Sequence, residues 1–435
     1  MKQTLFEEMM FKCNRCGFCQ DVCPTYAVTG NEFDVARGRI RMMRMVEENG
    51  DDLTAEKAIL TQVDQCLLCG ACVENCPSNV PTDTLLRLCR EKVLKKKGFS
   101  LFHSLVYRGV LTQPARLEKI SALIRVLDKT KLRSHVAKIA ANTAFGFLSR
   151  AAIYLPETLE TPAKKRLSKG ISPRSISFGG QAKICYFMGC GTNAFTPGAG
   201  LATLDCLEKL GFSVDIPPVY CCGGPHFSSG DIHKARSLAR KNIALLSGHS
   251  YDAIVSDCAT CTHTLHDYGS FFQKNDPIQE TLAGLKEKIT DINTFILENL
   301  KEFGNRSMIA PKQIVTYHDP CHAVRGMGVR RAPRKIIGTI PGMRLVEMEG
   351  ADSCCGGAGS YSFRHPEISE KILNKKIEAI EKTQASILAT SCPSCILQLG
   401  SGLRAKNLNI RVVHPMELLA QYLKKIKTAK TQGQN

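Results

Sequence analysis

Two runs of closely spaced cysteines constrain the fold more than any other feature of this 435-residue chain. In each run two residues separate the first three cysteines, three residues precede the fourth, and a proline follows. Three thiolates at this spacing can reach three corners of a tetrahedral metal centre from one short loop. The N-terminal part of the chain is therefore expected to fold around metal centres. The first run comprises Cys13, Cys16, Cys19 and Cys23, and the second comprises Cys66, Cys69, Cys72 and Cys76.

The spacing also indicates which metal centre to expect. Triplets followed by Cys-Pro are typical of two-cluster [4Fe–4S] ferredoxins, in which the fourth cysteine of each run binds the other cluster. Zinc is the alternative, but zinc ribbons use paired Cys-x2-Cys knuckles instead of triplets. A c-type haem is excluded because no Cys-x2-Cys pair here precedes a histidine. The predicted ligands are Cys13, Cys16, Cys19 and Cys76 for the first cubane cluster, and Cys23, Cys66, Cys69 and Cys72 for the second.

A different five-cysteine pattern occurs twice in the C-terminal part of the chain. Each copy has a single cysteine, a Cys-Cys-Gly-Gly segment after 31 or 33 positions, and a Cys-x2-Cys pair 36 or 37 positions later. Adjacent cysteines on a regular strand point to opposite faces. Both can face one centre only if the backbone turns there, which the glycines permit. The first CCG set is Cys190, Cys221, Cys222, Cys258 and Cys261, and the second CCG set is Cys321, Cys354, Cys355, Cys392 and Cys395.

Short apolar segments lead into these cysteines, and helical patterns separate the segments. Alternating strands and helices predict parallel α/β sheets. The CCG sets should then lie at the carboxyl ends of strands, where such sheets bind ligands. Strands are predicted at 184–188, 253–256, 314–317 and 387–389, and helices at 32–48, 232–246 and 368–380.

The predicted fold class is an α+β and α/β multidomain protein. A helical ferredoxin-like domain with two cubane clusters is followed by a helical linker and by two repeated α/β CCG halves. The predicted divisions are 1–90 for the two-cluster domain, 91–180 for the basic helical segment and linker, 181–305 and 306–425 for the two CCG halves, and 426–435 for a tail.

Most of the net charge of +18 falls on residues 86–170, which contain 19 Lys or Arg and 5 Asp or Glu. Apolar residues at helical spacing, such as Ile120 with Leu123 and Leu132 with Val136, make this segment amphipathic. Such helices can lie on an anionic membrane surface or dock an acidic subunit. A solvated helical face is the alternative. No motif for nucleic-acid binding is present, so no nucleic-acid partner is expected.

Several expectations follow from missing patterns. No run of about 18 apolar residues suggests a transmembrane helix. The N-terminus, MKQTLFEEMM, does not resemble a signal peptide, so a cytoplasmic location is expected, with peripheral membrane contact as an option. No G-x-G-x-x-G loop follows a strand, so no dinucleotide site is evident. Hydride removal from an organic substrate would then need a flavin on a partner subunit.

The segments CGFCQDVCPTY, ARGRI, CLLCGACVENCPS and CCGGAGSYSFRHPE carry a family resemblance. With the order of motifs, they resemble the iron–sulfur subunit of bacterial glycolate oxidase. Related subunits serve D-lactate and glycerol-3-phosphate dehydrogenases. The CCG halves are also similar to the heterodisulfide reductase subunit that binds non-cubane [4Fe–4S] clusters. The resemblance implies one such cluster for each CCG set, with structural zinc as the alternative.

The function implied is electron transfer within a flavin-dependent glycolate or D-lactate dehydrogenase complex. A partner FAD subunit would oxidise the substrate, and this chain would pass electrons toward a quinone or another acceptor. The alternative is a heterodisulfide-reductase-like catalytic subunit that reduces a disulfide or a quinone at a CCG cluster. Glycolate oxidase subunits can lack cysteines of the CCG pattern, and both sets are complete here, which keeps this alternative open.

No catalytic residue is assigned from the sequence. Histidines near the CCG cysteines are candidates for tuning cluster potential or relaying protons, although ordinary loop histidines are the simpler interpretation. Two arginines between the cysteine runs are candidate hydrogen-bond donors to cluster sulfur. Three further cysteines fall outside all patterns and are expected to be small buried residues. These residues are His226, His318, His322 and His365, then Arg37 and Arg39, and finally Cys89, Cys185 and Cys206.

Overall fold

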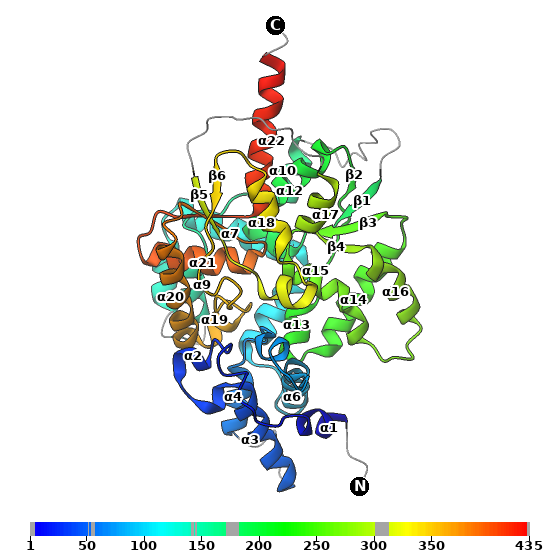
Figure 1. Cartoon of the computed structure of the whole chain (residues 1–435), viewed down its shortest axis with the longest axis vertical. Coiled ribbons are helices and arrows are strands. Elements are labelled where there is room, and N and C mark those ends of the chain that lie inside the picture. The colour runs from blue at the N-terminus through cyan, green and yellow to red at the C-terminus, as the bar shows by residue number, and fades with distance from the viewer. Residues whose placement is uncertain are drawn as a thin grey trace.

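The computed structural model joins an N-terminal group of helices to two parallel sheets surrounded by helices, which confirms the predicted fold class (Figure 1). Within the described part of the chain, no helix is both long and apolar enough to cross a membrane. The predicted linker end at 171–180, the boundary between 305 and 306, and the last three residues of the tail lie outside the described residues. The structure describes residues 5–50, 52–53, 57–140, 143, 146–170, 182–300 and 313–432.

The N-terminal helices surround a small apolar core that separates the two cysteine loops from solvent on one side. Met10, Met43 and Leu85 are fully buried in it. The predicted helix at 32–48 is a 3-10 turn followed by α3. The elements are α1 (Leu5–Phe11), α2 (Tyr26–Thr29), η1 (Glu32–Asp34), α3 (Ala36–Glu48), α4 (Lys57–Asp64), α5 (Ala71–Glu74) and α6 (Thr82–Lys97).

The basic segment is helical, as predicted; its first residues complete α6, which ends at Lys97, and its first separate element is a π-helix, η2. Its predicted apolar faces are only partly covered by the rest of the chain. Leu123 is 59% exposed and Ile139 is 76% exposed. The elements of this segment are η2 (His103–Leu111), α7 (Pro114–Lys129), α8 (Arg133–Ala140), α9 (Gly146–Tyr154) and α10 (Ala163–Gly170).

The two CCG halves contain sheets of identical topology, in agreement with the internal repeat. All neighbouring strands are parallel, and the strand orders are β2-β1-β3-β4 and β6-β5-β7-β8. The four predicted strands correspond to β1, β3, β5 and β7, the central pair of each sheet. The bounds are β1 (Lys183–Tyr186), β2 (Ser213–Asp215), β3 (Ala253–Ser256), β4 (Ile289–Asp291), β5 (Gln313–Tyr317), β6 (Met343–Leu345), β7 (Ile387–Ala389) and β8 (Arg411–Val413).

Helices connect these strands in each half, and α14 and α20 match the predicted helices. In the first half they are α11 (Cys190–Phe195), α12 (Pro197–Lys209), α13 (Gly224–Ser229), α14 (Ile232–Ser247), α15 (Ala259–His266), η3 (Tyr268–Phe271), α16 (Ile278–Lys288) and α17 (Ile292–Asn299). In the second half they are η4 (His322–Gly326), α18 (Arg331–Gly338), α19 (Tyr361–Arg364), α20 (Pro366–Lys382), α21 (Pro393–Ala405) and α22 (Pro415–Gln432).

The two CCG halves share their hydrophobic cores. One buried cluster contains Phe187 and Ile254 of the first half together with Leu388 and Leu399 of the second. The other combines side chains from β1 and α17 with side chains from β5 and α22. The C-terminal helix α22 crosses back to pack on α12 and extends away from the N-terminal helices (Figure 1). Separating the halves would expose apolar surface from both sheets.

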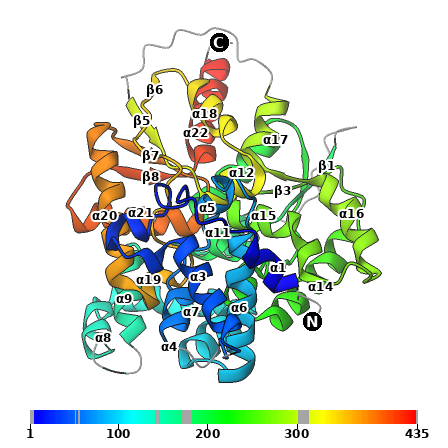
Figure 2. The same cartoon turned by 60° about the horizontal axis from the view of Figure 1, so that its bottom comes forward.

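The strand order fixes where a ligand can bind. In each sheet the second strand along the chain pairs with one side of the first strand, and the third strand pairs with its other side. The pairs β1/β3 and β5/β7 are therefore topological switch points. Ligands of open parallel sheets bind outside the carboxyl ends of the strands at such points. Turning the molecule brings the N-terminal helices in front of this region (Figure 2).

Candidate metal centres

The two ferredoxin-type loops repeat the same backbone conformation. Arg15 and Leu68 precede the second cysteine of their loops with φ angles of 62° and 52°. Gly17 and Gly70 follow that cysteine with φ angles of 97° and 75°. Left-handed conformations at these paired positions are unusual outside glycine. They wrap each loop around one point and turn its three thiols to the same side.

The structure gathers the eight cysteines into two neighbouring groups. The first lies between the first loop and the segment that follows the second loop. The second lies between the second loop and the start of α2. Cys72 borders both groups, and Cys16 is the most exposed of the eight. The first group contains Cys13, Cys16, Cys19 and Cys76, and the second contains Cys23, Cys66, Cys69 and Cys72.

The surroundings of these groups suit sulfur-rich anionic centres. Backbone N–H groups of Leu68 and Val80 donate to the thiol sulfurs of Cys66 and Cys76, both at 3.4 Å. Arg39 is buried beside the second group and pairs with Asp34 at 3.7 Å, but its Nη2 makes no hydrogen bond to any residue that the structure describes. A buried cationic group with a free N–H at this place fits a negatively charged cluster with sulfur acceptors.

The second candidate arginine, Arg37, lies beside the first group. It donates to the carboxylate of Glu32 at 2.5 Å, which raises the pKa of its guanidinium. The two arginines therefore differ. Arg37 donates a short hydrogen bond to its carboxylate partner, whereas Arg39 Nη2 lies 3.7 Å from the carboxylate of Asp34, beyond hydrogen-bond distance.

Each CCG set lies at the switch point of its sheet. Cys190 begins α11 after β1, and Cys258 caps α15 after β3. Cys321 and Cys392 occupy the same places after β5 and β7. The remaining cysteines of each set come from loops facing the same edge. This arrangement places the thiols where the sheet topology predicts a ligand.

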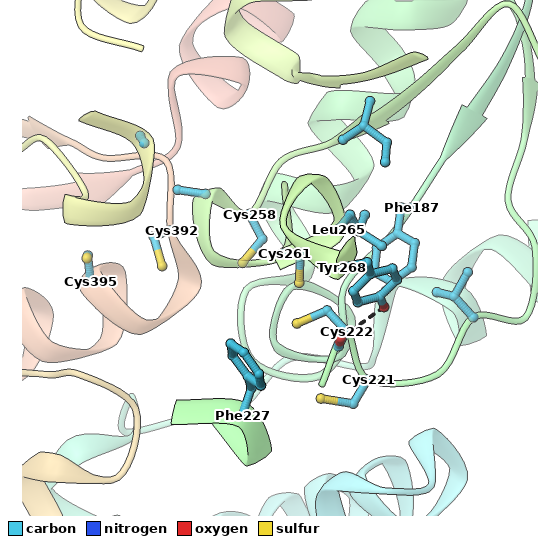
Figure 3. Packing of buried hydrophobic residues seen from close by; sticks show 14 of the residues in the cluster. Phe187, Cys221, Cys222, Phe227, Cys258, Cys261, Leu265, Tyr268, Cys392 and Cys395 are labelled. Atoms are coloured by element: carbon cyan, nitrogen blue, oxygen red, sulfur yellow. Dashed lines mark hydrogen bonds between the residues drawn. The ribbon is translucent and has the colours of Figure 1, made fainter. Parts of the chain in front are cut away.

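The Cys-Cys-Gly-Gly segments make the turns that the sequence requires. Gly223 and Gly356 have φ angles of 87° and 84°, which a residue with a side chain rarely adopts. A Cβ atom on Gly356 would lie 2.9 Å from the carbonyl oxygen of Ser369. Glycine therefore permits both the turn and the close approach to the following helix. Figure 3 shows the resulting grouping of Cys222, Cys258 and Cys261.

The two CCG sets border a common cavity of about 220 Å³, which includes Cys66 of the N-terminal module at its edge. The pKa of the Cys392 thiol is lowered, chiefly by a hydrogen bond with the Cys258 thiol of the other half. Nearby, Ala259 donates its N–H to the carbonyl of Ser391 at 3.0 Å. The sequence treats the sets as separate repeats, but the fold makes them neighbours (Figure 3).

The second ferredoxin group lies directly against the second CCG set. Leu67 is buried in one small cluster with Cys354 and Tyr361. Burial raises the pKa of the Cys69 thiol to about 12, and the neighbouring Cys321 thiol adds to the rise. Ferredoxin groups and CCG sets thus form one continuous series, from exposed Cys16 to the buried cavity.

Several ion pairs and hydrogen bonds hold the N-terminal module in this position. Asp64 at the end of α4 accepts from Arg364 and from His365, the latter at 2.8 Å. Those cationic partners lower the pKa of the Asp64 carboxyl despite its burial. Glu74 of α5 pairs with Arg325 and Arg330 of the second half. The predicted candidate His365 is therefore an interface residue.

The other candidate histidines lie closer to the cysteines. His226 is fully buried, 3.7 Å from Asp231, and neither ring nitrogen makes a hydrogen bond. His322 Nδ1 makes a hydrogen bond with the Thr260 hydroxyl at 3.0 Å, and burial lowers the pKa of the His322 imidazole to about 4. His318 lies next to Cys355 and Cys395, with the ligating atoms of the three residues within 4.8 Å of one another.

Two residues that border the cavity were not found from the sequence. Tyr107 of the π-helix donates to or accepts from the hydroxyl of Ser360 at 2.5 Å, and both line the cavity. Their neighbours on η2, His103 and Arg108, reach Asp231 of the first CCG half. No local pattern marks them, because their position depends on the packing of η2 across both halves.

The three unpatterned cysteines are buried, as expected. Cys89 is in the N-terminal core, and Cys185 and Cys206 are in the cores of the CCG halves. Burial raises the pKa of all three thiols, to about 12 for Cys89. They behave as small apolar side chains and lie outside the grouped thiols.

Comparison with known proteins identifies the same two kinds of cysteine-rich region. Residues 9–80 match a 4Fe-4S dicluster domain, and residues 184–266 and 315–400 each match a cysteine-rich CCG domain. A probable glycolate oxidase iron-sulfur subunit from Bacillus subtilis is 30% identical over 97% of this chain and 95% of its own length. The chain belongs to the glycolate oxidase iron–sulfur subunit family. It is thus an iron–sulfur component of an oxidoreductase complex, which implies a role in electron transfer.

Two further relatives of this iron–sulfur subunit align with a smaller part of the chain. One of the subunits of a CoM/CoB fumarate reductase from Methanothermobacter marburgensis is 32% identical over 81% of this chain and 60% of its own. Lactate utilization protein A from Bacillus subtilis is 31% identical over 54% of this chain and 98% of its own. A crystal structure of a hypothetical Helicobacter pylori protein covers 96% of this chain and 72% of its own, with a TM-score of 0.52 at 9% identity, and shows the fold alone.

Replacing one cysteine in either ferredoxin group should remove one cubane. Anaerobically purified Cys16→Ala and Cys69→Ala variants are expected to lose roughly four iron atoms per chain, because a cubane needs all four thiolates. Iron and zinc analysis measures the loss. Cys89→Ala is the matched control and should keep its iron. Stoichiometric zinc with little iron in the unmodified protein would contradict the assignment.

Replacing one cysteine of the adjacent pair in either CCG set should remove a signal that does not come from the cubanes. Cys222→Ser and Cys355→Ser are each expected to lose a different spectroscopic feature, since each thiol lies in a different set. Electron paramagnetic resonance of oxidised and reduced samples tests this, with Cys206→Ser as the control. Full iron content and unchanged spectra in both variants would show that these sets are not cluster sites.

Proposed function

We propose that this chain is the electron-transfer subunit of a flavin-dependent 2-hydroxyacid dehydrogenase complex of the glycolate or D-lactate type. A partner FAD subunit oxidises the substrate, and a quinone or another acceptor receives the electrons. The observation that carries the proposal is the continuous series of thiol groups from Cys16 at the surface to the CCG cavity. Such a series serves transport across the protein.

The proposal includes the ligands predicted from the sequence. The two ferredoxin groups hold [4Fe–4S] cubanes, and each CCG set holds a further, non-cubane cluster. Such clusters supply one-electron transfer when bound. The chain contributes ordered thiols, backbone N–H donors such as that of Leu68, and cationic groups such as Arg39.

The relatives support a division of labour between subunits. The Bacillus subtilis relative is named as one subunit of glycolate oxidase, so the remaining activity belongs to other chains. The cavity bordered by the CCG sets is lined largely by thiols and small polar residues, which suits a cluster-bearing site. A partner that carries FAD therefore completes the proposed complex.

The isolated chain is expected to bind no flavin and to oxidise neither glycolate nor D-lactate. Adding the purified flavoprotein partner should produce substrate-dependent bleaching of the iron–sulfur absorbance, because electrons then have a source. Anaerobic spectroscopy measures the change, with the partner alone and the chain alone as controls. Flavin that copurifies with the isolated chain, together with hydroxyacid oxidation, would refute the proposal.

A second candidate function is direct reduction of a disulfide or quinone at the CCG cavity. The contact between the Cys258 and Cys392 thiols favours it, because it brings the two sets to one space. The polar pair Tyr107 and Ser360 also borders that space. Chemically reduced chain, without any partner, would reoxidise on adding the disulfide or quinone if this function is correct. Lack of reoxidation by either compound would exclude it.

We also propose peripheral contact with an anionic membrane surface through α7 and α8. Val136 and Ile139 lie exposed on α8, and Leu132 lies exposed directly before it, among basic residues of this positively charged segment. The lysines at the end of α6 are less suitable, because Lys95 pairs with Glu91 and Lys96 pairs with Asp52. Apolar insertion combined with attraction of Lys and Arg to anionic lipid is the expected binding mode.

Liposome flotation tests the membrane contact. The chain should float with anionic liposomes more than with neutral ones, and added salt should weaken binding through screening. Replacing Leu132, Val136 and Ile139 together with Ser should abolish most of the flotation, since about 0.8 kcal/mol is lost per methylene removed from lipid. Neutralising Lys95, Lys96 and Lys97 should have the smaller effect. Equal binding to both lipids, insensitive to salt and to these changes, would show that the segment has another role.

A further inference from the structure

The internal repeat allows the surroundings of the two CCG sets to be compared position by position. Counting back from the single cysteine of each set, Phe187 of the first half matches His318 of the second. Each is the first residue after a central strand, β1 for Phe187 and β5 for His318. A fully apolar ring in one half is thus replaced by an imidazole in the other.

A second matched pair lies on the long helices α14 and α20. Gly223 packs against the carbonyl oxygen of Ala235, and Gly356 packs against that of Ser369, so Ala235 and Ser369 are equivalent. Seven positions further along each helix, the first half has Asn242 and the second has Lys376. The distance from the Cys-Cys pair to the Cys-x2-Cys pair is one residue longer in the second copy, and this extra residue lies before Ser369.

In the second half His318 lies against thiols of the set, and Lys376 lines one cavity together with Cys354. His318 is 1% exposed, its Nδ1 has no hydrogen-bond partner among the described residues, and it lies beside Cys355 and Cys395. Lys376 is 4% exposed and donates to the carbonyl of Gly350. Burial lowers the pKa of Lys376, while the neighbouring thiols Cys355 and Cys354 act to raise it.

The first half offers neutral groups at both places. Phe187 lies in the hydrophobic cluster with Cys222 and Cys261, next to Tyr268 (Figure 3). The amide of Asn242 is used up on the chain itself, donating to the carbonyl of Cys221 at 3.0 Å and to the Tyr268 hydroxyl at 3.1 Å. The first set therefore has neither an imidazole nor an ammonium group at these two positions.

We infer that His318 and Lys376 set the second CCG centre at a higher reduction potential than the first, so that electrons entering the CCG region collect in the second half. The inference rests on the proposed function, because it needs a cluster in each CCG set. It assigns to two residues of this chain a role in tuning and ordering the centres.

The physical basis is the charge that reduction adds. One electron makes a cluster more negative by one unit, and a nearby cation or N–H donor stabilises that charge more strongly in a buried site than in water. Hydrogen bonds to cluster sulfur raise the potential in the same way. The second set also lies next to the second ferredoxin group, through Leu67 and Cys354, so it is adjacent to the proposed supply of electrons.

Redox titration of the anaerobic, iron-replete full chain tests the inference. The electron paramagnetic resonance signals of the two sets are first assigned from Cys222→Ser and Cys355→Ser. The unmodified chain should show the second-set signal at the higher midpoint. His318→Phe and Lys376→Met should each shift that midpoint downward and leave the first-set midpoint in place. His318→Gln keeps an N–H donor, so its second-set midpoint should lie close to that of the unmodified chain.

The control is Lys375→Met, which removes a neighbouring lysine that contacts the N-terminal module at the carbonyl of Ala27. It should leave both midpoints unchanged. Unchanged second-set midpoints in both His318→Phe and Lys376→Met, at full iron content, overturn the inference. Loss of second-set iron in both His318→Phe and His318→Gln also overturns it, because His318 would then be a ligand. A lack of iron in the CCG halves of the unmodified chain instead refutes the proposed function.

Discussion

The structure depends on placing many thiols close together at the carboxyl edges of parallel strands. Burial raises the pKa of Cys69 and Cys72 in the second ferredoxin group, so these two free thiols are neutral and weakly nucleophilic. A bound metal centre reverses this, since only the thiolate binds metal and the cation offsets the cost of burying its charge. The surrounding fold therefore has to deliver the thiols in fixed positions while keeping other anions away. The two identical sheets do this by presenting Cys190 and Cys258, and Cys321 and Cys392, from adjacent strand ends.

Neither CCG half is a self-contained version of this arrangement. Asn293 of the first half bridges its own Asp291 and Ser391 of the second half, at 2.9 Å and 3.0 Å. Tyr317 reaches the same Ser391 hydroxyl at 3.1 Å. Both bonds end at Ser391, the residue before Cys392, and the Cys392 thiol makes a hydrogen bond with the Cys258 thiol of the other set. The hydrophobic clusters shared between the sheets and the polar bridge between them hold both cysteine sets in register. A displacement of one half would consequently alter both centres.

Local patterns in the sequence were sufficient where the chemistry itself is local. The triplet spacing around Cys16 and Cys69, the glycines after the paired cysteines and the short apolar segments before Cys258 and Cys392 gave the loops, turns and central strands. The ligand sets stay predictions. Contacts made across the fold had no such pattern. The meeting of Cys258 with Cys392, the position of Tyr107 beside Ser360, and the pairing of Asp64 with Arg364 depend on how distant elements pack. The amphipathic pattern of α8 indicated a helix correctly but could not show that its apolar side faces outward.

One residue of α6 strongly resists outward movement of the N-terminal module. The guanidinium of Arg90 is buried and donates to the carbonyls of Val63, Asp64 and Cys66 on one side and of Ser228 on the other. Hydrogen bonds of a charged group are worth about 1.5–3 kcal/mol each, and a buried charge stripped of them is worse still. Swinging the module outward would break the bond to Ser228 and leave part of this charge without a partner. Carrier domains that shuttle between two docking positions need a hinge and a weak, polar contact. This chain instead holds its N-terminal module in place, so the proposed electron transfer runs between centres at set distances and needs no diffusion of a tethered module.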